Sequence, residues 1–251
     1  MLRAACVEPI LVKGWSVARL YPETGLRPYC DLDLCVEPGQ LAAAMTVLSD
    51  PDCRRLSVEL HQGIPDLKDR NWKEAYGRSR LGRLGEVDVR VLCPEDLFRL
   101  LCLHLMRHGA CAPLWLCDLA VCLESHAADF DWDYCLSGNR ARAAWIRCWA
   151  GLARQLLGAR FDCPARIGEP PPWLGPAVLA RWARPLRESN WLDPIKAAYR
   201  RRLPPLSSRR LMQFLGMVGR VAEVPSRLWR QGRRWRRPAG RPFDLHEEAG
   251  E

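Results

Sequence analysis

Residues 29–36 read Tyr-Cys-Asp-Leu-Asp-Leu-Cys-Val, an apolar strand pattern that carries two carboxylates. Side chains alternate across a strand, so Asp31 and Asp33 project from one face while the two leucines point into the core. Two carboxylates held this close repel each other unless a hard cation such as Mg²⁺ lies between them. The spacing therefore indicates a cation site, although two surface acids at the wet end of a strand have the same pattern.

A strand and a turn precede the acidic pair. Residues 9–12 (Pro-Ile-Leu-Val) predict a short buried strand, which runs into Lys13-Gly14 and then into a segment with helical periodicity. The free N–H groups of a helix start bind anions, Gly14 lets the backbone approach a phosphate closely, and Lys13 adds a positive charge. An ordinary strand-to-helix turn with a solvated lysine has the same residues, so the prediction of an anion-binding turn depends on the acidic pair.

Five segments continue this pattern in order over about residues 9–160. They are Leu11-Val12-Lys13-Gly14; Leu20-Tyr21-Pro22 with Arg27 and Asp31-Leu32-Asp33-Leu34-Cys35-Val36; Val58-Glu59-Leu60-His61; Leu92-Cys93-Pro94-Glu95-Asp96-Leu97 with His104 and His108; and Trp115-Leu116-Cys117-Asp118-Leu119 with Asp131-Trp132. Together they resemble the uncharacterised bacterial nucleotidyltransferase family within the DNA polymerase beta-like superfamily. The ordered set is far more specific than any one motif.

The resemblance implies an α+β fold, in which a small mixed sheet carries the nucleotide site and a mostly helical region follows. It also implies that a nucleoside triphosphate, ATP in the first instance, is held by Lys13, Gly14, Ser16 and Arg27. The superfamily often has Gly-Ser where this chain has Gly14-Trp15, with Ser16 one place later. Relatives have a helical segment before this strand, so the native chain starts further upstream or this member lacks that support.

The resemblance further implies a three-acid site for Mg²⁺ or Mn²⁺. Its members are Asp31, Asp33 and Glu59, with Asp88 as a rival for the third position. Residues 56–60 predict a strand with Glu59 near its end, where a solvent-facing edge acid is the alternative. Two metal ions at such a site would suit nucleotidyl transfer, with Asp33 or Glu59 as the general base.

Three histidines lie in or near these motifs. His104 and His108 are four residues apart on one predicted helix face, which the resemblance turns toward the nucleotide pocket. A zinc site there is disfavoured because no Glu follows His104 and a third ligand is not evident. We expect both to line the core or the pocket. We expect His61 to lie on the strand face opposite Glu59 and to have a structural role.

The chain divides into three predicted parts. These are a nucleotidyltransferase-like core over residues 1–92, a helical region that completes the domain over 93–165, and a linker, helices and basic tail over 166–251. Helices are predicted from Pro94 to Gly109, over 114–123 and over 139–158. Within the second helix, Asp118 is an interior acid that lines the pocket or pairs with a nearby arginine. Three prolines at 170–172 mark the linker.

The cysteines and the lack of targeting segments indicate the cellular compartment of the protein. The 12 cysteines include no Cys-x-x-Cys pair and lie mostly in apolar patterns, which indicates a reducing cytoplasm. The sequence shows neither a signal peptide nor an apolar span of transmembrane length.

The net charge of the chain is concentrated at its C-terminal end. From residue 196 onward there are 14 Lys or Arg and 5 Asp or Glu, which accounts for the whole net charge of +9.

Residues 200–237 alternate arginine clusters with tryptophan, a composition that suits an anionic membrane surface or RNA, although a solvated tail has the same composition. The sequence therefore predicts a cytoplasmic enzyme, with peripheral membrane contact as an added expectation. It would transfer a nucleoside monophosphate to an acceptor that the sequence does not identify. The alternative is a non-catalytic adaptor of the same fold that binds a partner, a membrane or RNA through its tail.

Overall fold

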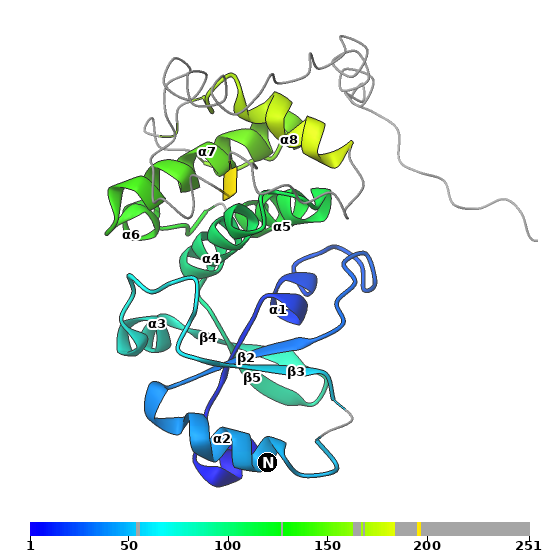
Figure 1. Cartoon of the computed structure of the whole chain (residues 1–251), viewed down its shortest axis with the longest axis vertical. Coiled ribbons are helices and arrows are strands. Elements are labelled where there is room, and N and C mark those ends of the chain that lie inside the picture. The colour runs from blue at the N-terminus through cyan, green and yellow to red at the C-terminus, as the bar shows by residue number, and fades with distance from the viewer. Residues whose placement is uncertain (54–55, 127, 163–166, 168, 184–194, 197–251) are drawn as a thin grey trace, which may run out of the picture.

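The computed structural model describes residues 1–53, 56–126, 128–162, 167, 169–183 and 195–196 of the 251-residue chain (Figure 1). Within these residues, helices surround a mixed sheet, which confirms the predicted α+β class. The predicted basic surface at 200–237 lies outside the described residues. No described helix combines the length and the apolar character that a bilayer crossing requires.

Five strands form one sheet in the order β3-β2-β1-β5-β4. Their bounds are β1 Ile10–Val12, β2 Leu32–Val36, β3 Val58–Gln62, β4 Arg80–Leu84 and β5 Val87–Val91. β1 pairs antiparallel with β2 and parallel with β5, β2 pairs parallel with β3, and β4 and β5 form an antiparallel hairpin. The apolar strand β1 is fully buried at the centre, where neither face meets water.

Short helices connect the strands. They are η1 (Leu2–Ala5) before β1, α1 (Gly14–Ala18) after it, η2 (Pro38–Gln40) and α2 (Leu41–Leu48) between β2 and β3, and α3 (Trp72–Arg78) before β4. Because β2 and β3 are parallel, their connection must cross over the sheet, and α2 forms that crossover. Figure 1 shows η1 and α2 below the sheet and α1 above it.

The two faces of the sheet are buried by different layers. On the face toward α2, Val36 and Leu60 belong to a small apolar cluster with Val7. On the other face, Cys35 joins the main core, which continues into the helices stacked above the sheet in Figure 1. This second face also carries Asp33, which is therefore covered although it is an acid. Asp33 is 4% exposed, whereas the neighbouring leucines of β2 are only half-buried.

The helical layer consists of α4 (Pro94–Arg107), α5 (Pro113–Glu124), α6 (Trp132–Leu136), α7 (Arg140–Leu157) and α8 (Leu174–Trp182). Local signals set the helix ends. Pro94 occupies the first turn of α4, the Asn139 side chain accepts a hydrogen bond from the backbone N–H of Arg142, and Gly158 ends α7 in a left-handed conformation. These ends agree with the predicted helices to within about two residues.

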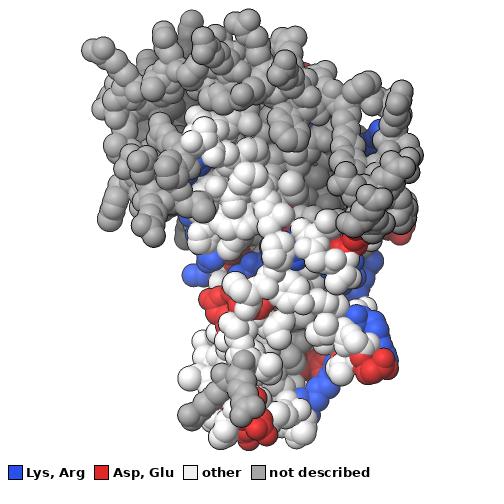
Figure 2. Space-filling model, turned by 90° about the vertical axis from the view of Figure 1, so that its right-hand side faces the viewer, with Lys and Arg blue, Asp and Glu red and all other residues white. Residues whose placement is uncertain are grey.

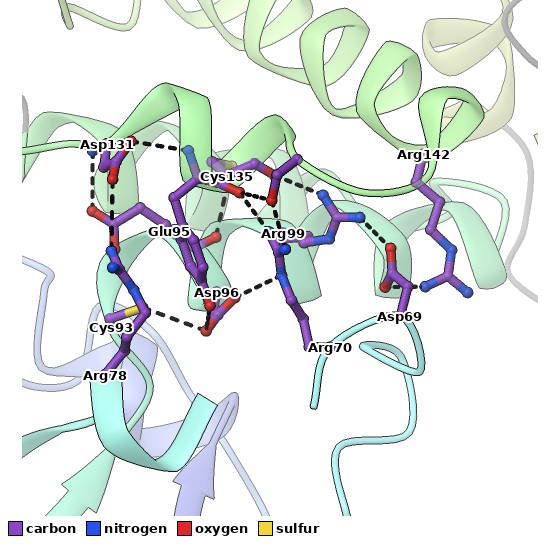
Figure 3. A network of polar contacts seen from close by, with 12 residues as sticks. Asp69, Arg70, Arg78, Cys93, Glu95, Asp96, Arg99, Asp131, Cys135 and Arg142 are labelled. Atoms are coloured by element: carbon purple, nitrogen blue, oxygen red, sulfur yellow. Dashed lines mark hydrogen bonds and ion pairs between the residues drawn. The ribbon is translucent and has the colours of Figure 1, made fainter. Parts of the chain in front are cut away.

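A buried polar network ties the loop after β3 to the helices (Figure 3). Arg99 of α4 is 0% exposed, forms an ion pair with Asp69 and donates to the Cys135 carbonyl over 2.6 Å. Asp69 also pairs with Arg142 of α7, at 2.5 Å. Since buried charges are stable only when paired, this network fixes the loop against α4 and α7.

The described part carries charges of both signs on its surface and buries most of its cysteines. Figure 2 shows basic and acidic side chains close together on one face, with uncharged surface around these groups. The 11 described cysteines are free thiols, and Cys102, Cys122 and Cys148 are buried in the core while Cys117 is partly exposed. Burial raises the pKa of the Cys148 thiol to about 12, so it behaves as a small apolar core residue.

Candidate functional site

The turn after β1 brings a strained lysine to the edge of the site. Lys13 has φ 51° and ψ −149°, and Gly14 has φ 38°. A Cβ atom on Gly14 would lie 3.1 Å from the carbonyl oxygen of Asp31, so a side chain at this position would press on the start of β2. The turn therefore requires glycine, and it directs Lys13 toward β2.

Asp33 is the centre of the site. It lies on β2 opposite Val12, and its Oδ1 atom is 2.7 Å from Nζ of Lys13. The same Oδ1 is 3.0 Å from Nε2 of His61 on β3. A buried carboxylate is costly unless it is paired, and these two contacts pair it.

Glu59 and His61 complete the group from the neighbouring strand. The parallel register places Glu59 directly opposite Asp33, and His61 follows two residues later on the same face. Nε2 of His61 lies 3.6 Å from Oε1 of Glu59, and one ligand atom from each of the three residues lies within 4.8 Å of the others. The Glu59 side chain is 59% exposed, so the group is open to solvent on this side.

The predicted strand face of His61 was wrong. Residues two apart on a strand share a face, so His61 lies beside Glu59 rather than behind it, and its ring contacts Asp33. His61 is the site residue that sequence reasoning missed, although the period-two alternation of β3 was sufficient to find it.

The acidic pair of the sequence is divided in the structure. β2 begins at Leu32, so Asp31 precedes the strand, and it is outside the group formed by Asp33, Glu59 and His61. Its carbonyl oxygen instead borders Gly14. Asp88 lies on β5 and pairs with Arg83 of the hairpin at 3.4 Å, so Glu59 rather than Asp88 is the acid next to Asp33.

The other residues predicted to hold phosphate stabilise the turn and the loop that follows it. The buried Ser16 hydroxyl donates to the Lys13 carbonyl over 2.7 Å. Arg27 forms an ion pair of 2.9 Å with the buried Asp118 of α5, to which the Tyr21 hydroxyl also donates over 2.7 Å. Of the two roles predicted for Asp118, the structure shows the pairing with an arginine.

Trp15, the departure from the superfamily pattern, packs against the sheet. A Cβ atom on Gly82 of β4 would lie 3.6 Å from its indole ring. The large ring is therefore accommodated by a glycine on the neighbouring hairpin, on the side of β1 away from Asp33.

An aromatic cluster on α4 and α5 lies within electrostatic range of Lys13. The ring centroids of His104 and His108 are 4.5 Å apart, and Trp115 lies 5.0 Å from His104. Burial, and then the charges of His108 and Lys13, lower the pKa of His104 to about 3, despite Asp66 at 4.0 Å. His104 is therefore neutral at physiological pH.

The donor set fits a divalent cation. Asp33 and Glu59 offer carboxylate oxygens, His61 offers an imidazole nitrogen, and the three are held by adjacent paired strands. Within the described residues, this is the one group of at least three His, Cys, Asp or Glu side chains with ligand spacing, and His104 with His108 forms no such group.

Sequence comparison relates the chain to a known protein family. The chain matches the family described as uncharacterised nucleotidyltransferase over residues 1–55 and 51–162, a region that includes Lys13, Asp33 and Glu59. No curated protein and no solved structure matches the chain. The matched region covers more than half of the sequence and contains the whole sheet. The chain therefore belongs to this uncharacterised nucleotidyltransferase family.

Proposed function

We propose that the protein transfers a nucleoside monophosphate from a metal-bound nucleoside triphosphate, with ATP as the expected donor, to an acceptor hydroxyl group. The observation that carries the proposal is the group of Asp33, Glu59 and His61 beside the Lys13-Gly14 turn, in a chain of the nucleotidyltransferase family. Family membership supports the transferase class, and the donor set supports a divalent metal. The acceptor class remains open to experiment, because function resides in the site rather than in the fold.

The residues have distinct tasks in this proposal. Asp33 and Glu59 hold the metal ion, whereas Asp31, which precedes β2, is outside this group. Lys13 and Gly14 receive the triphosphate, because the turn combines a positive charge with a close approach of the backbone. Ser16 and Arg27 contribute by fixing the turn and its following loop through the Lys13 carbonyl and Asp118.

A bound divalent ion supplies positive charge that stabilises the phosphoryl oxygens and the departing pyrophosphate. The acceptor hydroxyl must lose a proton, and Glu59 is the better placed of the two predicted bases. Its carboxylate is mostly exposed, whereas Oδ1 of Asp33 already contacts Lys13 and His61.

One observation favours a second candidate function. All of the net charge of +9 lies from residue 196 onward, which suits a non-catalytic adaptor that binds an anionic membrane or RNA through residues 200–237. Such an adaptor would bind its partner without metal or nucleotide, and its affinity would fall steeply with salt.

The test is labelling of a cell extract by the purified full-length protein with each of the four nucleoside triphosphates, labelled at the α-phosphate. We expect label on one acceptor, dependent on divalent metal. Asp33→Asn removes a charged ligand and should reduce labelling at least about 100-fold. Asp88→Asn is the matched control, because Asp88 is a strand acid paired with Arg83 outside the site.

Equal labelling by the Asp33→Asn variant and the Asp88→Asn control would remove Asp33 from the mechanism. Metal-independent retention of RNA or anionic vesicles, with no labelling by any of the four nucleotides, would favour the adaptor.

A further inference from the structure

The three donor atoms lie within 4.8 Å of one another, which is close enough for all three to contact one metal ion. Nε2 of His61 lies 3.0 Å from Oδ1 of Asp33 and 3.6 Å from Oε1 of Glu59. Metal–ligand bonds of about 2.1 Å place neighbouring ligands of an octahedral ion about 3 Å apart. The imidazole nitrogen is thus close enough to both carboxylates to be a third protein ligand, whereas Asp31 is outside this group.

The strand pairing makes this placement a property of the fold. Asp33 is paired with Glu59, and Cys35 with His61, in the parallel register of β2 and β3. The side chain of Cys35, on the same face of β2 as Asp33, is in the main core, so packing fixes this face of β2, and the parallel pairing ties β3 to it. His61 therefore stays near Asp33 unless the two strands change register.

Replacing an acid with imidazole changes which ions the site prefers. Mg²⁺ takes oxygen ligands and keeps several waters, whereas imidazole suits first-row transition ions. We infer that His61 is a metal ligand and that it makes the site select a first-row transition ion, such as Mn²⁺ or Co²⁺, over Mg²⁺. The inference deepens the proposed function and rests on it for the site's purpose, but metal binding itself can be measured without turnover.

Lys13 allows the effect of charge to be separated from the effect of a nitrogen ligand, because it contacts the same Asp33 oxygen as His61. Its ammonium lies 2.7 Å from Oδ1 of Asp33 and opposes any cation there by charge alone. Lys13→Met should therefore increase the affinities for Mg²⁺ and Co²⁺ by similar factors. Removing a nitrogen ligand should instead change the ratio between the two ions.

The experiment is calorimetric titration of the nucleotide-free, full-length protein with Mg²⁺, Mn²⁺ and Co²⁺. We expect Co²⁺ to bind at least about 100-fold more tightly than Mg²⁺. His61→Ala should reduce that ratio about tenfold or more, with the Mg²⁺ affinity changed less than about threefold. His126→Ala is the matched control, since His126 follows α5 and is absent from the metal-binding group.

Pulsed electron paramagnetic resonance of bound Mn²⁺ gives a direct reading of the ligand. The wild-type protein should show coupling to a nitrogen nucleus that is lost in His61→Ala and kept in His126→Ala. His61→Asp supplies oxygen in place of nitrogen, so it should shift preference toward Mg²⁺ and provides a second variant if His61→Ala does not fold.

The two proposals fail separately. Absence of nitrogen coupling in the wild-type protein, or a Co²⁺ to Mg²⁺ ratio unchanged in His61→Ala, would overturn the assignment of His61 and leave nucleotide transfer standing. Nitrogen coupling that depends on His61, in a protein that labels no acceptor, would uphold the metal assignment and remove the proposed transfer.

Discussion

Two adjacent residues, Lys13 and Gly14, have positive φ angles directly after β1. For an L-residue such as Lys13, this region of backbone space costs about 1–3 kcal/mol. Strain of this size persists only where the surrounding structure holds it. Here the ion pair to Asp33 and two hydrogen bonds from Ser16, one from its N–H and one from its hydroxyl, hold the Lys13 backbone and side chain. The turn is thus set before any ligand arrives.

Gly14→Ala should destabilise the protein by about 1–3 kcal/mol, because its φ of 38° disfavours a side chain and the new Cβ would meet the Asp31 carbonyl at 3.1 Å. It should also weaken binding of a nonhydrolysable triphosphate analogue. Urea unfolding measures the first effect and calorimetry the second. Gly39→Ala is the control, since a Cβ atom there would have no neighbour within 4 Å. Equal stability of the two variants would contradict the account of this turn.

At the scale of residues, the sequence predicted placements that follow from local order and missed those that depend on which strands and helices pair. Asp33 and Glu59 were predicted, and they lie opposite each other. Asp31 was grouped with them because spacing suggested a shared strand, yet β2 starts one residue later. The partner of Arg27 lies 91 residues away on α5, a separation at which no local pattern predicts contact.

At the scale of elements, α4 links the sheet to the helical layer. Its first turn is fully buried and contains Glu95 and Asp96. The loop before α6 holds the Glu95 carboxylate, and α6 together with the loop after β3 holds the Asp96 carboxylate. Its last turn presents His104 and Arg107 to Asp66 in the same loop. The two ends of α4 thus hold the loop after β3 and the segment around α6 in place.

Arg99→Met should lower the free energy of unfolding by about 3–5 kcal/mol. The substitution leaves the buried Cys135 carbonyl without this donor and deprives the partly buried Asp69 of one of its two cations. Arg83→Met, in the exposed β4–β5 hairpin, should change it by less than about 1 kcal/mol. Chemical denaturation of both variants compares them, and a small loss for Arg99→Met would show that the network of Figure 3 contributes little.

His104 should make stability depend on pH. Its pKa is about 3 in the folded protein, below the value of about 6.5 expected when unfolded, so the unfolded chain binds more protons between these values. Stability is therefore complete above about pH 6.5 and is lost as pH falls toward 3. Between pH 7 and 5, wild type should lose about 1–2 kcal/mol more than His104→Gln. Parallel losses in both proteins would place the pKa of His104 near its ordinary value.

At the scale of the whole molecule, the described part is a sheet covered by α2 on one face and by the helical layer on the other (Figure 1). The helix ends of α4 and α7 were predictable because proline, asparagine and glycine mark them in the sequence. The burial of Asp33 was not, since it depends on which face the helical layer covers. The predicted division into parts at residues 92 and 165 remains a prediction.

The same layering explains why one acid of the site is buried and the other is exposed. The covered face of β2 holds Asp33 with paired charges, and the edge strand β3 leaves Glu59 accessible to an acceptor. The site thus combines one buried, paired acid with one acid that is open to solvent.

The most direct test of the central claim is a crystal structure of the protein soaked with a divalent metal and a nonhydrolysable ATP analogue. The account predicts metal density bonded to Asp33 and Glu59, with the triphosphate against the Lys13-Gly14 turn. A well-ordered site with neither metal nor phosphate density near Asp33 would contradict it.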